Sequence, residues 1–263
     1  MFLLGGCVVG LDPALFLGVN RDTGSSDGEV SVTDQDEPTN TEQATERRDI
    51  WIYTGHGGAA VATPSGLGGI ESVQAHWNTE GWDTSVISEL PDVREMDQPK
   101  LLVLAAPGSR SQVRFEPLDV RKIEQFLESD GLLAVYVDAC TNPHINTLLS
   151  NLGMGIQLSA DSEQASAVVR DADIDDASTI VTGIDSLALF EPCRLTVQSG
   201  TSLVFRDLAS GNEVYVASGR PDVGGEAIVL GDFQLIDDAG YFEEADNKAF
   251  ASRLAARSPA TVR

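Results

Sequence analysis

The chain has 263 residues, of which 42% are hydrophobic; this is ordinary for a packed globule and excludes disorder throughout. Its 41 acids and 17 bases leave a formal net charge of -24, which disfavours nucleic acid as a partner because phosphate binding depends on Lys and Arg. The bases are mostly Arg rather than Lys. Such a surface fits concentrated salt, which screens self-repulsion, and it also fits an acidic secreted protein.

The N-terminal segment, residues 1–19, is mostly apolar, but Asp12 and Pro13 interrupt it, so it does not predict a membrane-spanning helix. Residues 4–7, LGGC, resemble a lipobox, in which the cysteine, here Cys7, is lipidated after signal cleavage. A signal needs an apolar stretch of ~7–15 residues before its cleavage site, and only six residues precede Cys7. Either the true start lies upstream or the resemblance is accidental. The first alternative predicts an exported protein anchored to the cell membrane or surface.

Residues 20–47 contain eight acids, two Arg and only three apolar residues. A segment of this kind cannot bury enough surface to offset the entropy cost of ordering it. The sequence therefore predicts a solvated acidic tether, extended by its own charge repulsion. A disordered tail without a function is the alternative that the sequence leaves open.

The first folded signal is residues 49–54, DIWIYT, a short apolar run closed by the glycine turn GHGG at 55–58; it predicts a buried strand. Residues 66–81 carry apolar side chains at helical spacing and lead into a second strand at 83–87. These segments make a β-α-β unit. Residues 100–106, KLLVLAA, are continuously apolar, as in parallel strands covered on both faces.

The alternation of strands and helices continues to the C-terminus. Helices are predicted at 116–129, 143–152 and 247–257, strands at 131–137, 202–206, 213–218 and 226–230, and short strands or loop-bordered segments at 178–183 and 193–197. The acidic stretch 161–176 is expected to be a loop. This order predicts an α/β fold over residues 48–263, a three-layer sandwich with a mainly parallel central sheet.

Several segments together resemble a known group of domains. They are the GHGG turn, LAAPG at 104–108, IEQFLESDGLLAVYVDA at 123–139 and VLGDFQLIDDAGYFEEADNKAFASRLA at 229–255. Their order is similar to that of non-catalytic class I glutamine-amidotransferase-like domains of gliding-motility and intraflagellar-transport proteins and of uncharacterised membrane-associated proteins. The resemblance covers roughly residues 49–257 and implies a flavodoxin-like, or amidotransferase-like, fold.

True class I glutamine amidotransferases carry a nucleophilic Cys in a strained Gly-x-Cys-x-Gly turn, activated by a His and a Glu near the C-terminus. The corresponding place here is residues 137–142, VDACTN, where Cys140 lies between a strand and a helix. Asp138 and Asn142 stand where the small glycines would permit the strained backbone. No His follows His144, so the resemblance implies that the catalytic set is not present.

Candidate ligand-binding residues lie where the predicted parallel strands end, the edge at which open α/β sheets bind ligands. They are Gly55, His56, Gly57, Gly58, Pro107, Asp138, Cys140 and Asp232. Asp138 and Asp232 could bind a cation, accept from a sugar hydroxyl or act as acid and base, but Asp at such positions also commonly caps a following helix or turn. The turn around His56 lacks the Lys of a phosphate loop, which favours a structural turn.

The cysteines predict no disulfide framework, because their number is odd, and no two have metal-ligand spacing. Cys140 and Cys193 are therefore expected to be reduced core residues. His144 lies four residues after Cys140 but no third ligand is near, and His76 is expected at the surface or at the boundary of the core, without a role. No metal and no cofactor is predicted.

The sequence favours a binding or interaction module, exported and tethered at the cell surface by a lipid anchor in the membrane, that recognises an unknown protein or a small polar ligand. The alternative is a hydrolase of amides or carbohydrates that uses Asp138, Asp232 or Cys140 at the strand ends. Substitution of these residues separates the two, because an enzyme loses activity and a binding module loses only affinity. A subunit of a transport or surface assembly follows from the family resemblance alone.

Overall fold

A computed structural model describes eleven stretches of the chain, all within the compact unit Thr45–Arg263. They are residues 49–58, 69–96, 99–107, 114–138, 140–162, 167–170, 179–181, 183–198, 202–207, 213–238 and 241–257. The segments 1–19 and 20–47, with Cys7, lie outside the described residues. No helix in the described stretches is long and apolar enough to cross a bilayer.

A nine-stranded sheet forms the centre of the domain, with the order β2-β1-β3-β4-β11-β10-β8-β5 and with β9 paired to β10. Its strands are β1 (Asp49–Tyr53), β2 (Asp83–Ile87), β3 (Leu101–Ala105), β4 (Leu132–Tyr136), β5 (Ile156–Ser162), β8 (Cys193–Val197), β9 (Ser202–Asp207), β10 (Glu213–Gly219) and β11 (Glu226–Leu230). The strands from β2 to β11 in this order are parallel, and those beyond β11 pair antiparallel.

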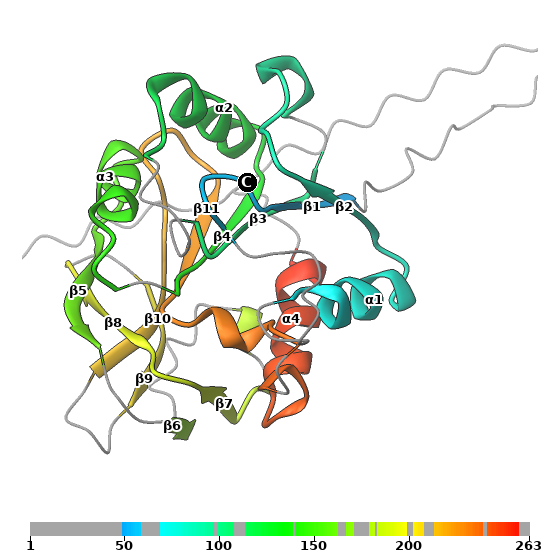
Figure 1. The fold of residues 1–263 in the computed structure, drawn as a ribbon, viewed down its shortest axis with the longest axis vertical. Helices are drawn as coiled ribbons and strands as arrows, with labels where there is room; N and C mark the ends of the chain where they lie inside the picture. The colour runs from blue at the N-terminus through cyan, green and yellow to red at the C-terminus, as the bar shows by residue number, and fades with distance from the viewer. Residues whose placement is uncertain are drawn as a thin grey trace, which may run out of the picture. The chain divides into compact units, whose positions relative to one another are not determined.

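Helices cover both faces of the sheet, which makes three layers (Figure 1). Helices α2 (Pro117–Glu128) and α3 (Pro143–Asn151) lie on one face, and α1 (Glu71–Thr79) and α4 (Asn247–Ala256) on the other. The short 3-10 helices are η1 (Val93–Glu95), η2 (Thr179–Val181), η3 (Phe233–Leu235) and η4 (Tyr241–Glu243). The predicted α/β three-layer sandwich is confirmed, with a mixed rather than purely parallel sheet.

The central strands are buried on both faces because their sequences are apolar at every position. All five residues of β3 and all five of β4 are buried. Successive side chains of a strand point to opposite faces, so each strand contributes to two separate cores. Ile52 and Val103 pack on the α1 side, and Leu102 and Val135 on the α2 side.

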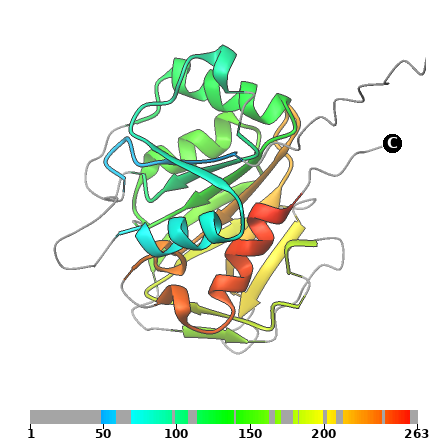
Figure 2. The same cartoon turned by 90° about the vertical axis from the view of Figure 1, so that its right-hand side faces the viewer.

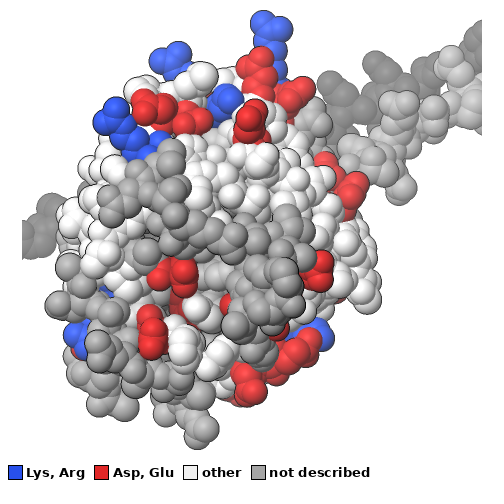
Figure 3. Space-filling view, viewed as in Figure 1, with Lys and Arg blue, Asp and Glu red and all other residues white. Residues whose placement is uncertain are grey.

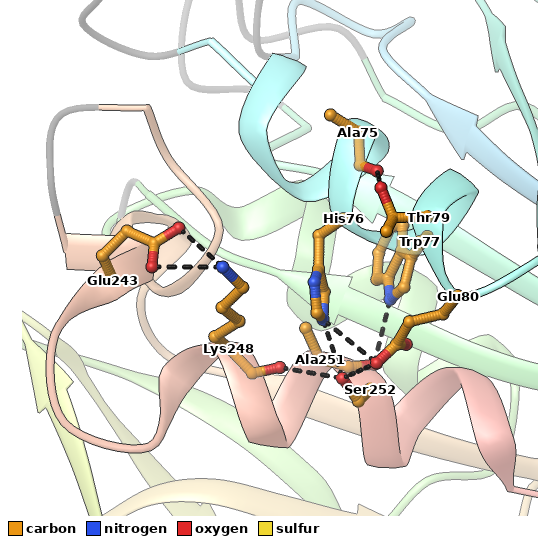
Figure 4. Close-up of polar contacts among 9 residues, drawn as sticks. All are labelled: Ala75, His76, Trp77, Thr79, Glu80, Glu243, Lys248, Ala251 and Ser252. Atoms are coloured by element: carbon orange, nitrogen blue, oxygen red, sulfur yellow. Dashed lines mark hydrogen bonds and ion pairs between the residues drawn. The ribbon is translucent and has the colours of Figure 1, made fainter.

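Helices α1 and α4 lie side by side on their face of the sheet (Figure 2). The indole Nε1 of the buried Trp77 donates to the carbonyl oxygen of Ala251 at 3.0 Å. Nearer the surface, Ser252 Oγ lies 2.7 Å from His76 Nε2 and donates to Glu80 Oε1 at 2.6 Å (Figure 4). The expectation of a boundary position for His76 is confirmed, but the side chain has a role in joining two helices.

Three strands, β5, β6 (Ala167–Arg170) and β7 (Ser186–Leu189), were not anticipated by the sequence. Strand β6 lies within the acidic stretch 161–176 that was expected to be a loop, and it pairs with β7 in a separate two-stranded sheet. The first strand of the antiparallel half, β5, was also missed, and residues 179–181 form η2 rather than a strand. These strands are stabilised by pairing with strands that are distant in sequence, and the local residue pattern does not indicate such pairing.

Candidate functional site at the carboxyl edge of the sheet

The predicted glycine turn after β1, residues 55–58, is tightly packed. A Cβ at Gly58 would lie 2.5 Å from the carbonyl oxygen of Ala105, so only glycine fits there. His56 adopts φ 52 and Gly57 φ 69, both in the left-handed region. The chain therefore reverses sharply at the end of β1, and this turns the imidazole of His56 toward the protein rather than the solvent; its side chain is 11% exposed.

Both ring nitrogens of His56 are engaged by the protein itself. The hydroxyl of Tyr53 bonds to Nδ1, and Nε2 lies 3.3 Å from Asp119 Oδ2, in the first turn of α2. An imidazole with its proton on Nε2 satisfies both contacts. The ring of Phe115 stacks on the imidazole with centroids 4.3 Å apart. Tyr53, His56, Phe115 and Asp119 together form what we call the His56 cluster.

Burial raises the pKa of the Tyr53 phenol well above its ordinary range, and the charges of Asp119 and Glu89 act in the same direction. The phenol therefore stays neutral and donates to His56. Sequence reasoning missed Tyr53, Phe115 and Asp119. The spacing of Tyr53, three residues before His56, is the only local signal, because the other two come from a distant part of the chain.

Asp138 and Asp232 follow the adjacent parallel strands β4 and β11, as predicted. In the register of these strands Leu230 lies beside Tyr136, so the two Asp residues stand beside each other two positions later. Asp138 is exposed, and its Oδ1 accepts a 3.4 Å bond from Gln234 Nε2. The register of β4 and β11 thus brings the two residues to the same edge of the sheet.

Asp232 is only 1% exposed and acts as a cap. Its Oδ1 accepts from the backbone N–H of Gln234 at 2.8 Å and its Oδ2 from that of Phe190 at 2.5 Å. Burial raises the pKa of Asp232 to about 7, although the two backbone bonds lower it, and the charges of Asp138 and Asp237 add to the rise. Both oxygens are thus turned toward the backbone and neither is free for a ligand.

Cys140 forms a disulfide with Cys193, so the expectation that both are reduced core residues is wrong. Cys140 lies in the turn after β4, Cys193 is the first residue of β8, and their Cα atoms are 5.1 Å apart across a sequence separation of 53. The odd number of cysteines did not exclude a disulfide, because the third cysteine, Cys7, lies outside the domain. Cys140 thus has no thiol that could act as a nucleophile while the disulfide is intact.

Pro107 and Asn142 connect the ends of β3 and β4. The side-chain amide of the buried Asn142 donates to the carbonyl oxygen of Pro107 at 3.2 Å. Its Oδ1 accepts from the backbone N–H of His144 at 3.0 Å and so caps the start of α3. Asn142 occupies the place of a nucleophile-elbow glycine, and here it is a structural capping residue.

The candidate residues therefore share one edge of the sheet, and within the described stretches the protein itself holds several of their side chains. Among the described residues, no group of three or more His, Cys, Asp and Glu side chains could hold a metal ion. The side chains of Cys140, Asp232 and His56 are engaged in a disulfide, a backbone cap and the His56 cluster, and Asp138 is exposed. The geometry at this edge holds strand ends and loops together.

No family model matches the chain, and no curated protein sequence matches it. Solved structures match it by fold. The N-terminal domain of mmIFT52 superposes with a TM-score of 0.62 at 16% identity, over 80% of this chain and 98% of that one. A ThuA-like protein from Bacteroides uniformis gives 0.57 at 12% identity, over 85% and 96%. A cytoplasmic protein from Salmonella typhimurium gives 0.57 at 10%, over 79% and 95%.

At such identities the likeness shows the fold alone. The domain shares the α/β fold of these structures, which agrees with the predicted three-layer sandwich. What the domain does has to be argued from its own residues.

Proposed function

We propose that this chain is a non-catalytic interaction domain, exported and held at the cell membrane by a lipid on Cys7. The observation that carries the proposal is the engagement of the candidate catalytic groups. The sulfur of Cys140 is bonded to Cys193, both nitrogens of His56 have partners, and both oxygens of Asp232 accept from backbone N–H groups. A side chain that is fixed in this way supports the fold rather than a reaction.

The disulfide also supports the exported location. Disulfides form and persist in oxidising surroundings and are rare in the cytosol of mesophiles. The fold likeness to the mmIFT52 N-terminal domain supports the finer kinship to non-catalytic amidotransferase-like domains that the sequence resembles. Together these observations favour a domain that works by binding.

The hydrolase alternative rests on Asp138 and Asp232. The pKa of Asp232 at about 7 is suited to a general acid. Its carboxyl group, however, is buried and points at two backbone amides, so it does not reach a substrate that contacts Asp138. We therefore favour the interaction domain.

The catalytic part of the proposal is tested by turnover. The purified protein is incubated with amide, ester and glycoside substrates, beside Asp138→Asn and a Cys140→Ala/Cys193→Ala double variant. We expect no turnover above buffer in any of the proteins. Turnover that the Asp138→Asn variant lacks would establish the hydrolase instead.

The location is tested by fractionating cells of the source organism that express either the natural protein or a Cys7→Ser variant. We expect the natural protein in the membrane fraction and the variant outside it. Equal distribution of the two proteins would exclude Cys7 as the anchor.

A further inference from the structure

Two edge strands of the central sheet, β5 and β2, differ in how their backbone groups are covered. At the β5 edge, Asn146 of α3 donates from Nδ2 to the carbonyl oxygen of Leu158 at 3.1 Å and accepts on Oδ1 from its N–H at 2.7 Å. The Asn146 side chain therefore satisfies the backbone N–H and C=O groups of Leu158, as a neighbouring strand would. At the β2 edge, no described residue pairs with the outer side of the strand.

The backbone groups of successive β2 residues point alternately toward β1 and away from it, which identifies the outward-facing groups. The N–H of Thr54, directly after β1, donates to the carbonyl oxygen of Ile87 at 2.9 Å, so the backbone groups of Ile87 face β1. Backbone groups of successive strand residues point to opposite sides. The N–H and C=O groups of Thr84 and Val86 therefore point away from the sheet, in the position to receive another strand.

The side chains of β2 present two different surfaces. On the α1 side, Thr84 Oγ1 donates to Asn78 Oδ1 at 2.8 Å, and Trp82 and Val86 are partly buried against the core. On the other side, Asp83 and Ser85 are exposed. A strand added beside β2 would meet apolar surface on one face and a carboxylate on the other.

The segment around β2 is uniformly acidic. Between Ile70 and Val93 the sequence contains five acids, Glu71, Glu80, Asp83, Glu89 and Asp92, and no Lys or Arg. In Figure 3 acidic side chains appear along the right-hand margin, at the level where β2 and α1 lie in Figure 1. This charge disfavours a second copy as the occupant, because two acidic edges would repel each other. It also disfavours residues 20–47, which carry eight acids and two Arg.

We propose that β2 is a docking edge for an extended segment of a partner protein in which Lys or Arg alternates with aliphatic residues. The partner strand bonds to the backbone of Thr84 and Val86, places its basic residues beside Asp83 and its aliphatic residues beside Val86 and Trp82. Strand addition of this kind takes affinity from backbone bonds and specificity from alternate side chains. The inference deepens the proposed function and rests on it.

The probe is a short synthetic peptide of alternating Lys and Val, titrated into the intact protein and followed by fluorescence anisotropy and amide NMR. Two matched peptides serve as controls: one alternates Glu and Val, and the other is the Lys-Val sequence methylated on every second backbone nitrogen. We expect the Lys-Val peptide to bind and to slow hydrogen exchange at the N–H groups of Thr84 and Val86. The two control peptides should bind at least several-fold more weakly.

Two variants locate the docking edge. Val86→Pro removes one outward donor while leaving the bonds to β1, since proline is tolerated on edge strands. The loss of one backbone bond should weaken peptide binding roughly three- to tenfold. Asp83→Lys reverses the charge and should weaken binding by a similar factor, whereas Glu128→Lys, the same change at an exposed position of α2, should leave it unaltered.

The outcomes separate the two proposals. Failure of the Lys-Val peptide to bind, equal binding of the methylated peptide, or unchanged exchange at Thr84 and Val86 in the natural protein each overturns the docking edge. None of these results bears on catalysis or location. Conversely, substrate turnover that depends on Asp138 overturns the proposed function, whatever the peptide does.

Discussion

The hydroxyl group of Tyr136, at the end of β4, is fully buried and has no hydrogen-bond partner among the described residues. Burial raises the pKa of this phenol far above its ordinary value, so it remains a neutral donor without an acceptor. Leaving a buried polar group unpaired costs about 1–3 kcal/mol. We predict that Tyr136→Phe increases the free energy of unfolding by about 1 kcal/mol in urea denaturation.

Tyr215 provides the matched control. It is equally buried, but its hydroxyl donates to Glu213 Oε2 at 2.9 Å. Tyr215→Phe should therefore destabilise the domain, and the two substitutions should act in opposite directions. A loss of stability in Tyr136→Phe would mean that its hydroxyl has a partner.

Asp232 makes the stability of the fold depend on pH. Its pKa rises from 3.8 in the unfolded chain to about 7 in the folded protein, so the folded state binds more protons between these values. The stability contribution is thus fully present below pH 4 and is lost as the pH rises through about 7. Removing the charge of Asp138 should reduce this loss of stability, because that charge raises the pKa of Asp232.

We predict that Asp138→Asn lowers the pKa of Asp232, measured by NMR titration of the side-chain carboxyl carbon. The variant should also lose less stability than the natural protein between pH 4 and 7. Asp130→Asn, at an exposed position after α2, serves as the control and should leave the titration unchanged. An unchanged Asp232 titration in Asp138→Asn would show that the two carboxyl groups do not interact.

At the scale of single residues, the sequence indicated where Asp138 and Asp232 lie but not how they are used. Their positions follow from apolar runs that end in Asp, and adjacent parallel strands end at one edge. The partners of Asp232, the backbone amides of Phe190 and Gln234, depend on how a loop folds back over β11. No periodicity reports such a contact, and the same holds for Asp119 in the His56 cluster.

Among the elements, the disulfide joins the turn after β4 to β8 and so connects the parallel and antiparallel halves of the sheet. Closing a loop of 53 residues removes chain entropy from the unfolded state worth about 4 kcal/mol. Cys140→Ala and Cys193→Ala should each lower the free energy of unfolding by roughly 2–4 kcal/mol, and the double variant by no more.

Thiol alkylation checks the premise of that prediction. Without reductant neither Cys140 nor Cys193 should react in the unfolded protein, and both should react after reduction. Reaction of Cys140 and Cys193 without reductant would mean that the disulfide is not formed in the isolated protein.

The side chain of Asn146, in α3, caps the backbone of Leu158 in β5. We predict that Asn146→Ala lowers the free energy of unfolding by about 1 kcal/mol, because two backbone groups of Leu158 lose their partner. The uncovered edge should also promote self-association, measured by light scattering. Asn151→Ala, at the exposed end of the same helix, should do neither.

The elements themselves were largely predictable where a local pattern dominates. Strands β2 and β11 begin and end at the predicted residues, and α3 ends one residue early. The pattern failed at β5, β6 and β7, which belong to the antiparallel and two-stranded parts. Strand β5 is mixed in polarity, and β6 and β7 are only four residues long, so their pairing depends on neighbours distant in sequence.

For the whole molecule, the net charge of -24 opposes the compact state. Salt reduces this repulsion, because the Debye length falls from about 10 Å at 0.1 M to about 3 Å at 1 M. We predict that the melting temperature rises between these NaCl concentrations. Comparison with an uncharged osmolyte of equal osmolality isolates screening, and a melting temperature that is constant or falls with NaCl would contradict the prediction.

The contrast between the two sheet edges limits what kind of assembly the domain can join. Continuous growth of a β-ribbon needs a receptive strand at both ends of every unit, so that each added copy offers a new template. Here Asn146 blocks one end, while β2 remains open among the described residues. Growth of a continuous β-ribbon from domain to domain through β2 and β5 is therefore interrupted at Leu158.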